Sequence, residues 1–552
     1  MNRQSMFAKK VAYVITIGLL LIPLFWLSHP ATRGSNQSKG SPGGKLAQLR
    51  QEYGISRGQL GEIDPAGEAI KLATLGLRPF AVNLLWQQAD EYKTRKDFSN
   101  LSATLNQIVR LQPNFYSVWN YLAWELSYNV SVEFDDYRDR YHWLMRGVEF
   151  LKEGTKYNQR DPRLLRDIGR FISRKIGRAD EHKQFRRLFK EDDEFHGSRP
   201  LALRDNWLVG KEWFRKAEEM VDTQDVTIKG TSTLLFRSEA PLCQMSYADA
   251  LEKDGIFGEV AQRAWKRATQ DWDQYGSLDI PTTYGDGIII RLNDKELYQQ
   301  LIKELDEKLD ALEPGLRKKI DQERLDTLTP NHRKALDTPE QQRTEQQHIL
   351  ASQAEAILEV TQDDIARRIA SQAKAILEVT QDDVARRIEG AKVREARKLA
   401  KEAAEHKKMV GYIRNYRDIV NFEYWRLRAQ VEQTDEAVTA RELIYKAEKA
   451  LEDADLEAAT ENFDKGFAAW RKVLDMFPDL ASNQLSGDDL MEMIRKYQLL
   501  REQDNKVGGL PKDFPLRDII RIHGNDADRK NLIPEDEEKD PTNEVGKSPA
   551  RR

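Results

Sequence analysis

The sequence has very little cysteine: Cys243 is the only one among 552 residues, so the chain can form no internal disulfide and no cysteine-based metal cage. It also lacks an excess of charge of one sign, because charged residues make up 32% of the chain while the net charge is only −4. Nucleic-acid binding needs a concentrated basic surface, and no basic stripe stands out in the sequence. We therefore expect no nucleic acid among the partners.

Common enzyme signatures are missing as well. There is no G-x4-GK[ST], no H-E-x-x-H and no G-x-S-x-G, and Gly285-Asp286-Gly287 lacks the third glycine of a dinucleotide fingerprint. Cys243 has no histidine nearby in sequence to act as a base, which favours a buried structural thiol over a nucleophile. Two acidic stretches with a histidine, 133–142 and 191–196, could supply metal ligands, but in so charged a chain solvated surface explains them better. We expect no catalysis, no metal and no cofactor.

Long apolar runs are scarce, with one exception near the start of the chain. Residues 11–28 carry no charge and reach about 25 Å as a helix, enough to cross a bilayer. The alternative is a cleaved signal peptide, but the run ends in the bulky residues 24–27 instead of a small-residue cleavage site. Basic residues before it predict a cytoplasmic segment 1–10 and an extracytoplasmic body, anchored in the cell membrane by a single pass. Residues 29–45, rich in Gly, Ser and Pro, predict a flexible tether.

Beyond the tether, the composition changes several times along the chain. Residues 46–220 contain successive amphipathic helices, whereas residues 221–293 carry β-branched and turn residues that could form short strands. Residues 294–431 are dominated by Glu, Asp, Lys, Arg, Ala and Leu, which predicts long charged helices. A further helical hairpin is expected at 432–506, and residues 507–552 are predicted to be mostly disordered. The expected fold class is all-α.

The charged region contains two further features. A short coiled-coil-like seam could support self-association. Its apolar residues are Ile302, Leu305, Leu309 and Leu312. A tandem duplication follows, with ASQAEAILEVTQDDIARRI at 351–369 and ASQAKAILEVTQDDVARRI at 370–388. If residues 340–410 formed one continuous helix, it would extend on the order of 100 Å, and the copies would face directions roughly 100° apart. We therefore expect this helix to project into solvent as a spacer or arm.

Several stretches resemble tetratricopeptide repeats, which stack helical hairpins of about 34 residues. The segment Trp119-x2-Leu122-Ala123-x2-Leu126 is close to the opening W-x2-L-G-x2-Y of that family, and Leu-x2-Ile-Gly-x2-Ile at 165–172 opens a similar pair. The positions singled out for helix packing are Ala89, Tyr92, Leu105, Pro113, Trp119, Leu122, Ala123, Leu126, Gly169, Ala459 and Phe463. The resemblance implies a concave surface that grips peptides or partner domains, and no catalytic residues. The whole chain also resembles bacterial single-anchor membrane proteins of uncharacterised function.

These features together predict a membrane-anchored helical-repeat protein that acts in protein–protein binding or assembly, with an unknown protein or peptide partner. Two alternatives remain open: a structural spacer between membrane and envelope, and an enzyme with an unrecognised site in 221–293. Clustered tryptophans could stack sugars or peptide side chains, although their helical spacing favours the core. They are Trp86, Trp119, Trp124, Trp143, Trp207 and Trp213.

Overall fold

The structure, a computed structural model, covers the chain in part. It describes residues 78–534, apart from residues 286, 341–342, 380–382 and 504–508, together with a few single positions before residue 78. The predicted anchor at 11–28 lies, but for two single positions, outside the described residues. Within the described part, no helix is long and apolar enough to cross a membrane. The described residues form an all-α fold, as predicted, with 81% in helices and 1% in strands.

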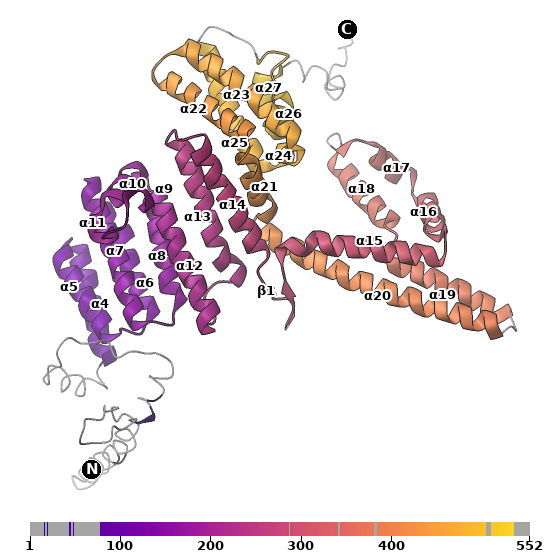
Figure 1. The fold of residues 1–552 in the computed structure, drawn as a ribbon, viewed down its shortest axis with the longest axis horizontal. Helices are drawn as coiled ribbons and strands as arrows, with labels where there is room; N and C mark the ends of the chain where they lie inside the picture. The colour runs from indigo at the N-terminus through magenta and orange to yellow at the C-terminus, as the bar shows by residue number, and fades with distance from the viewer. Residues whose placement is uncertain are drawn as a thin grey trace, which may run out of the picture. The chain divides into compact units, whose positions relative to one another are not determined.

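The chain folds into two compact units, and the second is inserted within the first. Unit 1 comprises Met1–Ala268, Glu432–Met476 and Asp488–Arg552, whereas unit 2 comprises Thr269–Val431 and Phe477–Gly487. Figure 1 shows the elements of both. Segments far apart in sequence therefore build unit 1.

Unit 1 begins with three helical hairpins, and each contains a helix whose start is capped by a side chain. The paired helices are α4 (Arg78–Thr94) with α5 (Phe98–Leu111), α6 (Tyr116–Trp124) with α7 (Tyr137–Tyr157), and α8 (Pro162–Arg170) with α12 (Asn206–Gln224). Asp97, Asp136 and Asp161 accept hydrogen bonds from the first-turn amides of α5, α7 and α8, which fixes where these helices start. The π-helical segments η1 (Glu125–Val130) and η3 (Phe171–Lys175) continue α6 and α8.

Short helices fill the connections between the longer ones. They are η2 (Ser131–Glu133), α9 (Ile176–Arg178), α10 (His182–Glu191), α11 (Asp193–His196) and η4 (Leu201–Leu203). One continuous core of buried side chains joins these hairpins, with Leu105, Leu122, Leu151 and Ile168 at or below 1% exposure.

The region 221–293 is mainly helical, and one pair of the short strands expected there forms. It contains α13 (Thr233–Lys253) and α14 (Glu259–Gly276), and the stretch 226–230 is a loop between α12 and α13. The β-branched residues of that loop have no neighbouring strand to pair with. Among the described residues of this region, strand structure is limited to β1 (Ile280–Pro281) and β2 (Ile289–Ile290), an antiparallel pair with Ile280 opposite Ile290.

Unit 1 resumes after the insertion with further helices. These are α22 (Asp435–Glu452), α23 (Leu456–Met476), the main part of α25 (Gln484–Gln503), α26 (Arg517–His523) and α27 (Asp526–Leu532). The expected disorder after residue 507 is therefore wrong for 509–534. The Leu510 amide donates to the Leu532 carbonyl at 2.7 Å, and Ile519 and Ile520 are fully buried, so this segment carries enough apolar side chains to pack.

Unit 2 is built around the longest described helix, α20 (Asp383–Ile419). The remaining elements are η5 (Leu292–Asp294), α15 (Lys295–Leu312), α16 (Leu316–Thr327), α17 (Pro330–Asp337), α18 (Glu345–Leu358), α19 (Gln362–Val379), α21 (Phe422–Glu432) and α24 (Pro478–Ser482). In Figure 1, α15 and α19 lie along α20. Leu305 and Leu309, from the seam predicted to allow self-association, are buried in the core that α15 shares with α19 and α20.

The duplicated segment does not form the single long helix considered above. The first copy contains the break between α18 and α19, and the second spans the described end of α19 and the described start of α20. Thr361 and Asp364 cap the start of α19 reciprocally: the Thr361 amide donates to the Asp364 carboxylate (2.9 Å), and the Asp364 amide donates to the Thr361 hydroxyl (3.2 Å). Ile365 and Ile369 are buried, so this part packs in unit 2 instead of projecting into solvent.

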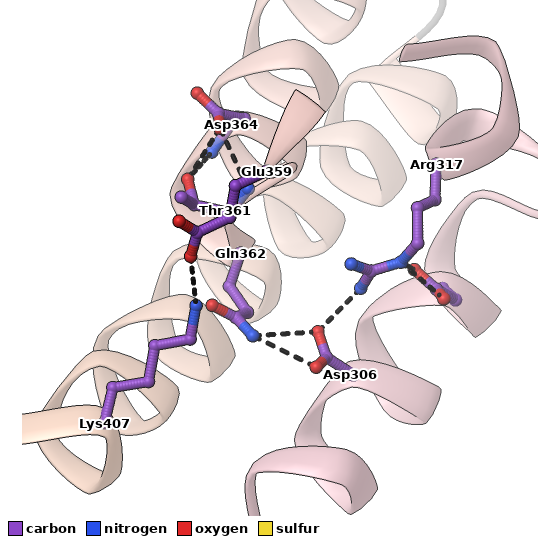
Figure 2. A network of polar contacts seen from close by, with 8 residues as sticks. Asp306, Arg317, Glu359, Thr361, Gln362, Asp364 and Lys407 are labelled. Atoms are coloured by element: carbon purple, nitrogen blue, oxygen red, sulfur yellow. Dashed lines mark hydrogen bonds and ion pairs between the residues drawn. The ribbon is translucent and has the colours of Figure 1, made fainter. Parts of the chain in front are cut away.

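Polar contacts join this turn to α15 and α20, and α15 is joined in the same network to α16, as Figure 2 shows. The Gln362 amide donates to both carboxylate oxygens of Asp306 on α15, at 3.1 and 3.0 Å. Arg317 on α16 pairs with Asp306 at 2.6 Å, and Lys407 on α20 lies 3.6 Å from Glu359. The break in the first copy is thus a docked turn with its own partners.

Candidate functional site

Most residues singled out from the repeat pattern lie in the helix interfaces of unit 1. Ala89, Leu105, Trp119, Leu122, Ala123, Leu126, Gly169, Ala459 and Phe463 are buried, and Tyr92 and Pro113 are half-buried. The Trp119 indole nitrogen donates to the Pro113 carbonyl at 2.8 Å, which joins the end of one hairpin to the start of the next. These residues build the scaffold and leave little surface for a ligand.

Small residues allow the paired helices to approach closely at two corresponding places. A Cβ added to Gly147 on α7 would lie 2.6 Å from the Ala123 carbonyl oxygen on α6. A Cβ added to Gly210 on α12 would lie 2.7 Å from the Ser173 Cβ, and 3.1 Å from the Gly169 carbonyl oxygen. The second and third hairpins therefore share one mode of packing.

The π-helical segments occupy corresponding positions in the same two hairpins. In each case the π-helix begins near the end of the sequence motif, η1 directly after Trp124 and η3 directly after Arg170. Such segments are rare and occur frequently at functional sites. Each contains a buried serine: Ser127 donates to the Leu144 carbonyl at 3.1 Å, and Ser173 to the Gly169 carbonyl at 2.7 Å.

The first helices of these hairpins lie next to one another, and a buried carboxylate joins two of them. Asp167 on α8 accepts hydrogen bonds from the Tyr116 hydroxyl and the Asn120 amide on α6, both at 2.7 Å. Burial raises the pKa of Asp167 above its ordinary value, and these hydrogen bonds oppose that shift. On the other side, Arg166 of α8 pairs with Glu239 of α13 at 3.0 Å. The helices α6, α8 and α13 therefore form one layer.

Four aromatic side chains follow one another along α4, α6 and η1. We call Trp86 of α4, Tyr121 and Trp124 of α6, and Tyr128 of η1 the aromatic strip. The ring centroids are 5.3 Å apart for Trp86 and Tyr121, 6.3 Å for Tyr121 and Trp124, and 6.1 Å for Trp124 and Tyr128. Tyr121 and Trp124 are 47% and 42% exposed. An exposed series of aromatic rings in contact offers apolar area together with stacking faces.

Cations from η3 and the end of α8 border the strip at Tyr128. We call Arg170, Arg174 and Lys175 the cationic patch. The Lys175 ammonium lies 4.3 Å from the centre of the Tyr128 ring, a cation–π contact. Burial raises the pKa of Tyr128, and the charges of Arg170 and Arg174 act against this shift.

The cations of the patch differ in their partners. Arg174 forms an ion pair with Glu239, whereas Arg170 is exposed and forms no ion pair with any described residue. Lys175 has no ion pair in the described part of the chain either, although Asp180 and Glu181 lie close enough to influence its pKa. Burial is the largest influence and lowers the pKa of Lys175. The half-buried ammonium is thus incompletely compensated.

Part of this site was predictable from the sequence. Trp86 and Trp124 belong to the tryptophans considered above for stacking, whereas no pattern singled out Tyr121, Tyr128 or the cations. Trp119 and Trp207 are buried, Trp86, Trp143 and Trp213 are half-buried, and only Trp124 of this set is exposed. The available signal was the spacing of Tyr121, Trp124 and Tyr128, which follows one helical face beside the packing positions.

The other candidate residues have structural surroundings. Cys243 is buried on α13, and burial raises the pKa of its thiol to about 12, which disfavours the nucleophilic thiolate. In the acidic stretches, Asp136 caps α7, and Asp192 caps α11 and accepts from the Tyr141 hydroxyl at 2.9 Å. Within the described residues, no group of three His, Cys, Asp or Glu side chains is placed to hold a metal ion.

Comparison with known proteins adds no assignment. No protein-family model matches the chain, and no curated protein matches it. The many helical hairpins are compatible with a helical repeat fold, while membership in the tetratricopeptide family stays a prediction.

Proposed function

We propose that the chain is a membrane-anchored binding protein whose unit 1 presents the aromatic strip and the cationic patch to a protein partner. The observation that carries this proposal is the exposure of Tyr121 and Trp124, at 47% and 42%, on a layer of packed helices. Surface aromatic residues contribute disproportionately to protein binding, because they bury a large area at a small cost in side-chain entropy. The anchor at 11–28 comes from the sequence alone and would hold this surface near the bilayer.

Two other functions have less support. An enzyme with a site in 221–293 would have to use a region that forms the α13–α14 hairpin, with its cysteine buried. A pure spacer fits the long helix α20 but gives no role to exposed aromatic side chains in unit 1. Binding accounts for both the scaffold and the surface.

The test compares partners crosslinked in membranes to the full chain and to Trp124→Ala, with Phe115→Ala as the matched control. Phe115 is also an exposed aromatic residue, at 60%, and it immediately precedes α6. Removing a binding hot spot typically costs at least ~2 kcal/mol, so we expect recovery of the true partner to fall about 30-fold for Trp124→Ala. The control should leave recovery unchanged. An identical set of partners for all three chains would contradict the proposal and favour the spacer.

A further inference from the structure

We propose that the strip and the patch together bind an acidic peptide segment that carries an aromatic residue, a proposal that rests on the binding function above. A carboxylate of the peptide would lie between Arg170 and Lys175, and its aromatic side chain would stack on Trp124 and Tyr121. The cationic patch and the aromatic strip support this inference through separate observations.

The patch supplies the anion-binding half. Arg170 is exposed without an ion pair among the described residues, and Lys175 keeps its ammonium against the Tyr128 ring. Two nearby carboxylates are engaged in other ion pairs: Glu239 pairs with Arg174, and Glu181 pairs with Arg140. Asp180 raises the pKa of Lys175, and Arg170 lowers that of Asp167, but among the described residues neither carboxylate forms an ion pair with Arg170 or Lys175. A ligand carboxylate would therefore offset charge that unit 1 itself compensates only in part. Arginine and lysine also bind carboxylates through charge-assisted hydrogen bonds.

The strip supplies the aromatic half. Trp124 and Tyr128 lie nearly parallel, with an interplanar angle of 19°, and Tyr121 continues the exposed surface toward α4. The stacking of a ligand ring on Trp124 would bury apolar area on both partners. Because the strip ends at the patch, a single short peptide could reach both halves.

The distribution of charge favours a peptide over a nucleic acid. Single-stranded nucleic acids also bind to aromatic and cationic surfaces, but their phosphates run along the whole site. Here Arg170 and Lys175 lie at the η3 end of the strip, whereas at the α4 end Lys93 is paired with Glu125, Arg95 is paired with Glu91, and the carboxylate of Asp90 is exposed. A phosphate backbone along the strip would meet cations that are already paired and the negative charge of Asp90. A peptide with its acidic group at one end would not.

The test measures binding of the full chain in detergent micelles to random polymers of known composition. The probes are a glutamate–tyrosine copolymer, polyglutamate, a lysine–tyrosine copolymer and oligothymidine. We expect the glutamate–tyrosine copolymer to bind most tightly and the lysine–tyrosine copolymer not to bind. Affinity for the best probe should fall as the salt concentration rises, because an ion pair is screened. Tighter binding of oligothymidine than of the acidic copolymer would overturn the peptide proposal.

Substitutions separate the two halves of the site. Arg170→Ala and Lys175→Met should each weaken binding of both acidic polymers about tenfold, since each removes a charge-assisted contact while methionine keeps the packing of the lysine stem. Trp124→Ala should weaken only the aromatic copolymer. Arg110→Ala, which removes an exposed cation from α5, serves as the control and should change nothing. Far-ultraviolet circular dichroism shows that each variant is folded.

The outcomes distinguish this inference from the proposed function. If the cation variants bind the acidic copolymer as well as the parent chain does, the acidic ligand class is wrong. If Trp124→Ala still loses its crosslinked partner in membranes in that case, the binding function stands without it. If Trp124→Ala also keeps its partner, both proposals fail.

Discussion

At the scale of single residues, the packing of unit 1 depends on glycines that no larger residue can replace. Gly147→Ala should destabilise unit 1 by about 1–3 kcal/mol, because the added methyl group would lie 2.6 Å from a backbone carbonyl that cannot move independently of its helix. Thermal unfolding monitored by tryptophan fluorescence measures the change. Gly411→Ala on α20 is the control: nothing lies within 4 Å of the added Cβ, so helix propensity predicts no loss and a gain of up to ~1 kcal/mol. Equal changes in thermal stability for Gly147→Ala and Gly411→Ala would refute the close-packing explanation.

The same scale shows what the sequence could and could not predict. Positions such as Leu122 and Ala123 were predictable as packing residues because burial repeats with the helical period, and both are fully buried. The neighbouring π-helical segments were not predictable, since a π-helix shifts the hydrogen bonding by one residue and arises from tertiary packing. A projection of the sequence onto a regular α-helix would therefore not have predicted the contact between Lys175 and Tyr128.

At the scale of elements, the duplicated segment contains a helix-cap pattern that its helix-favouring composition led us to overlook. Each copy contains Thr-x-x-Asp, at 361–364 and 380–383, which is the pattern of a reciprocal helix cap. The high helix propensity around it suggested one continuous helix, yet the first of these caps starts α19 and buries Ile365 and Ile369. Conversely, the β-branched stretch 226–230 suggested a strand where no partner strand exists. In both cases the structure depends on contacts with other parts of the fold, which the local sequence does not specify.

The cap can be tested directly. Thr361→Ala should cost about 1 kcal/mol, because it leaves the Asp364 amide without its side-chain acceptor and frays the first turn of α19. Hydrogen exchange of the amides at 362–365 should accelerate by roughly fivefold in response. Ser371→Ala, at an exposed position within α19, provides the control and should leave these amides unchanged. Unaltered exchange in both variants would show that the contacts with other helices hold the turn without the cap.

At the scale of the whole molecule, unit 1 is continuous across an insertion that the sequence did not reveal. The Tyr445 ring of α22 packs 5.5 Å from Phe257, which precedes α14, and the Tyr445 hydroxyl would lie 2.7 Å from a Cβ added to Gly255. The hairpin after the insertion therefore packs on the hairpin before it. Sequence patterns describe neighbours along the chain, so they predicted each hairpin but not that residues 269–431 separate two that are adjacent in space.

A buried charge network at this contact makes the stability of unit 1 depend on pH. Glu252 at the end of α13 accepts a hydrogen bond from the Trp265 indole at 2.7 Å, and Arg441 on α22 pairs with Glu432 at 2.6 Å. Burial, followed by the nearby charge of Glu432, raises the pKa of Glu252 from 4.5 to about 8, while Arg441 acts in the opposite direction. The folded state thus holds a proton that the unfolded state releases at lower pH.

The sign of the resulting effect follows from linkage. Because the folded-state pKa of Glu252 is raised, its contribution to stability is fully present below about pH 4.5 and is lost as the pH rises through about 8. The Glu252→Gln side chain cannot ionise, and it keeps an oxygen acceptor for Trp265. As the pH rises from 5 to 9, the free energy of unfolding of the variant should therefore increase, relative to that of the parent chain, by on the order of 1–3 kcal/mol. Urea unfolding of unit 1 at several pH values measures this difference. Glu153→Gln, an exposed glutamate on α7, should follow the parent curve. If the free energy of unfolding varied with pH in the same way for the parent and Glu252→Gln, Arg441 would have to keep Glu252 ionised over the whole pH range. The contact across the insertion would then be a permanent ion network.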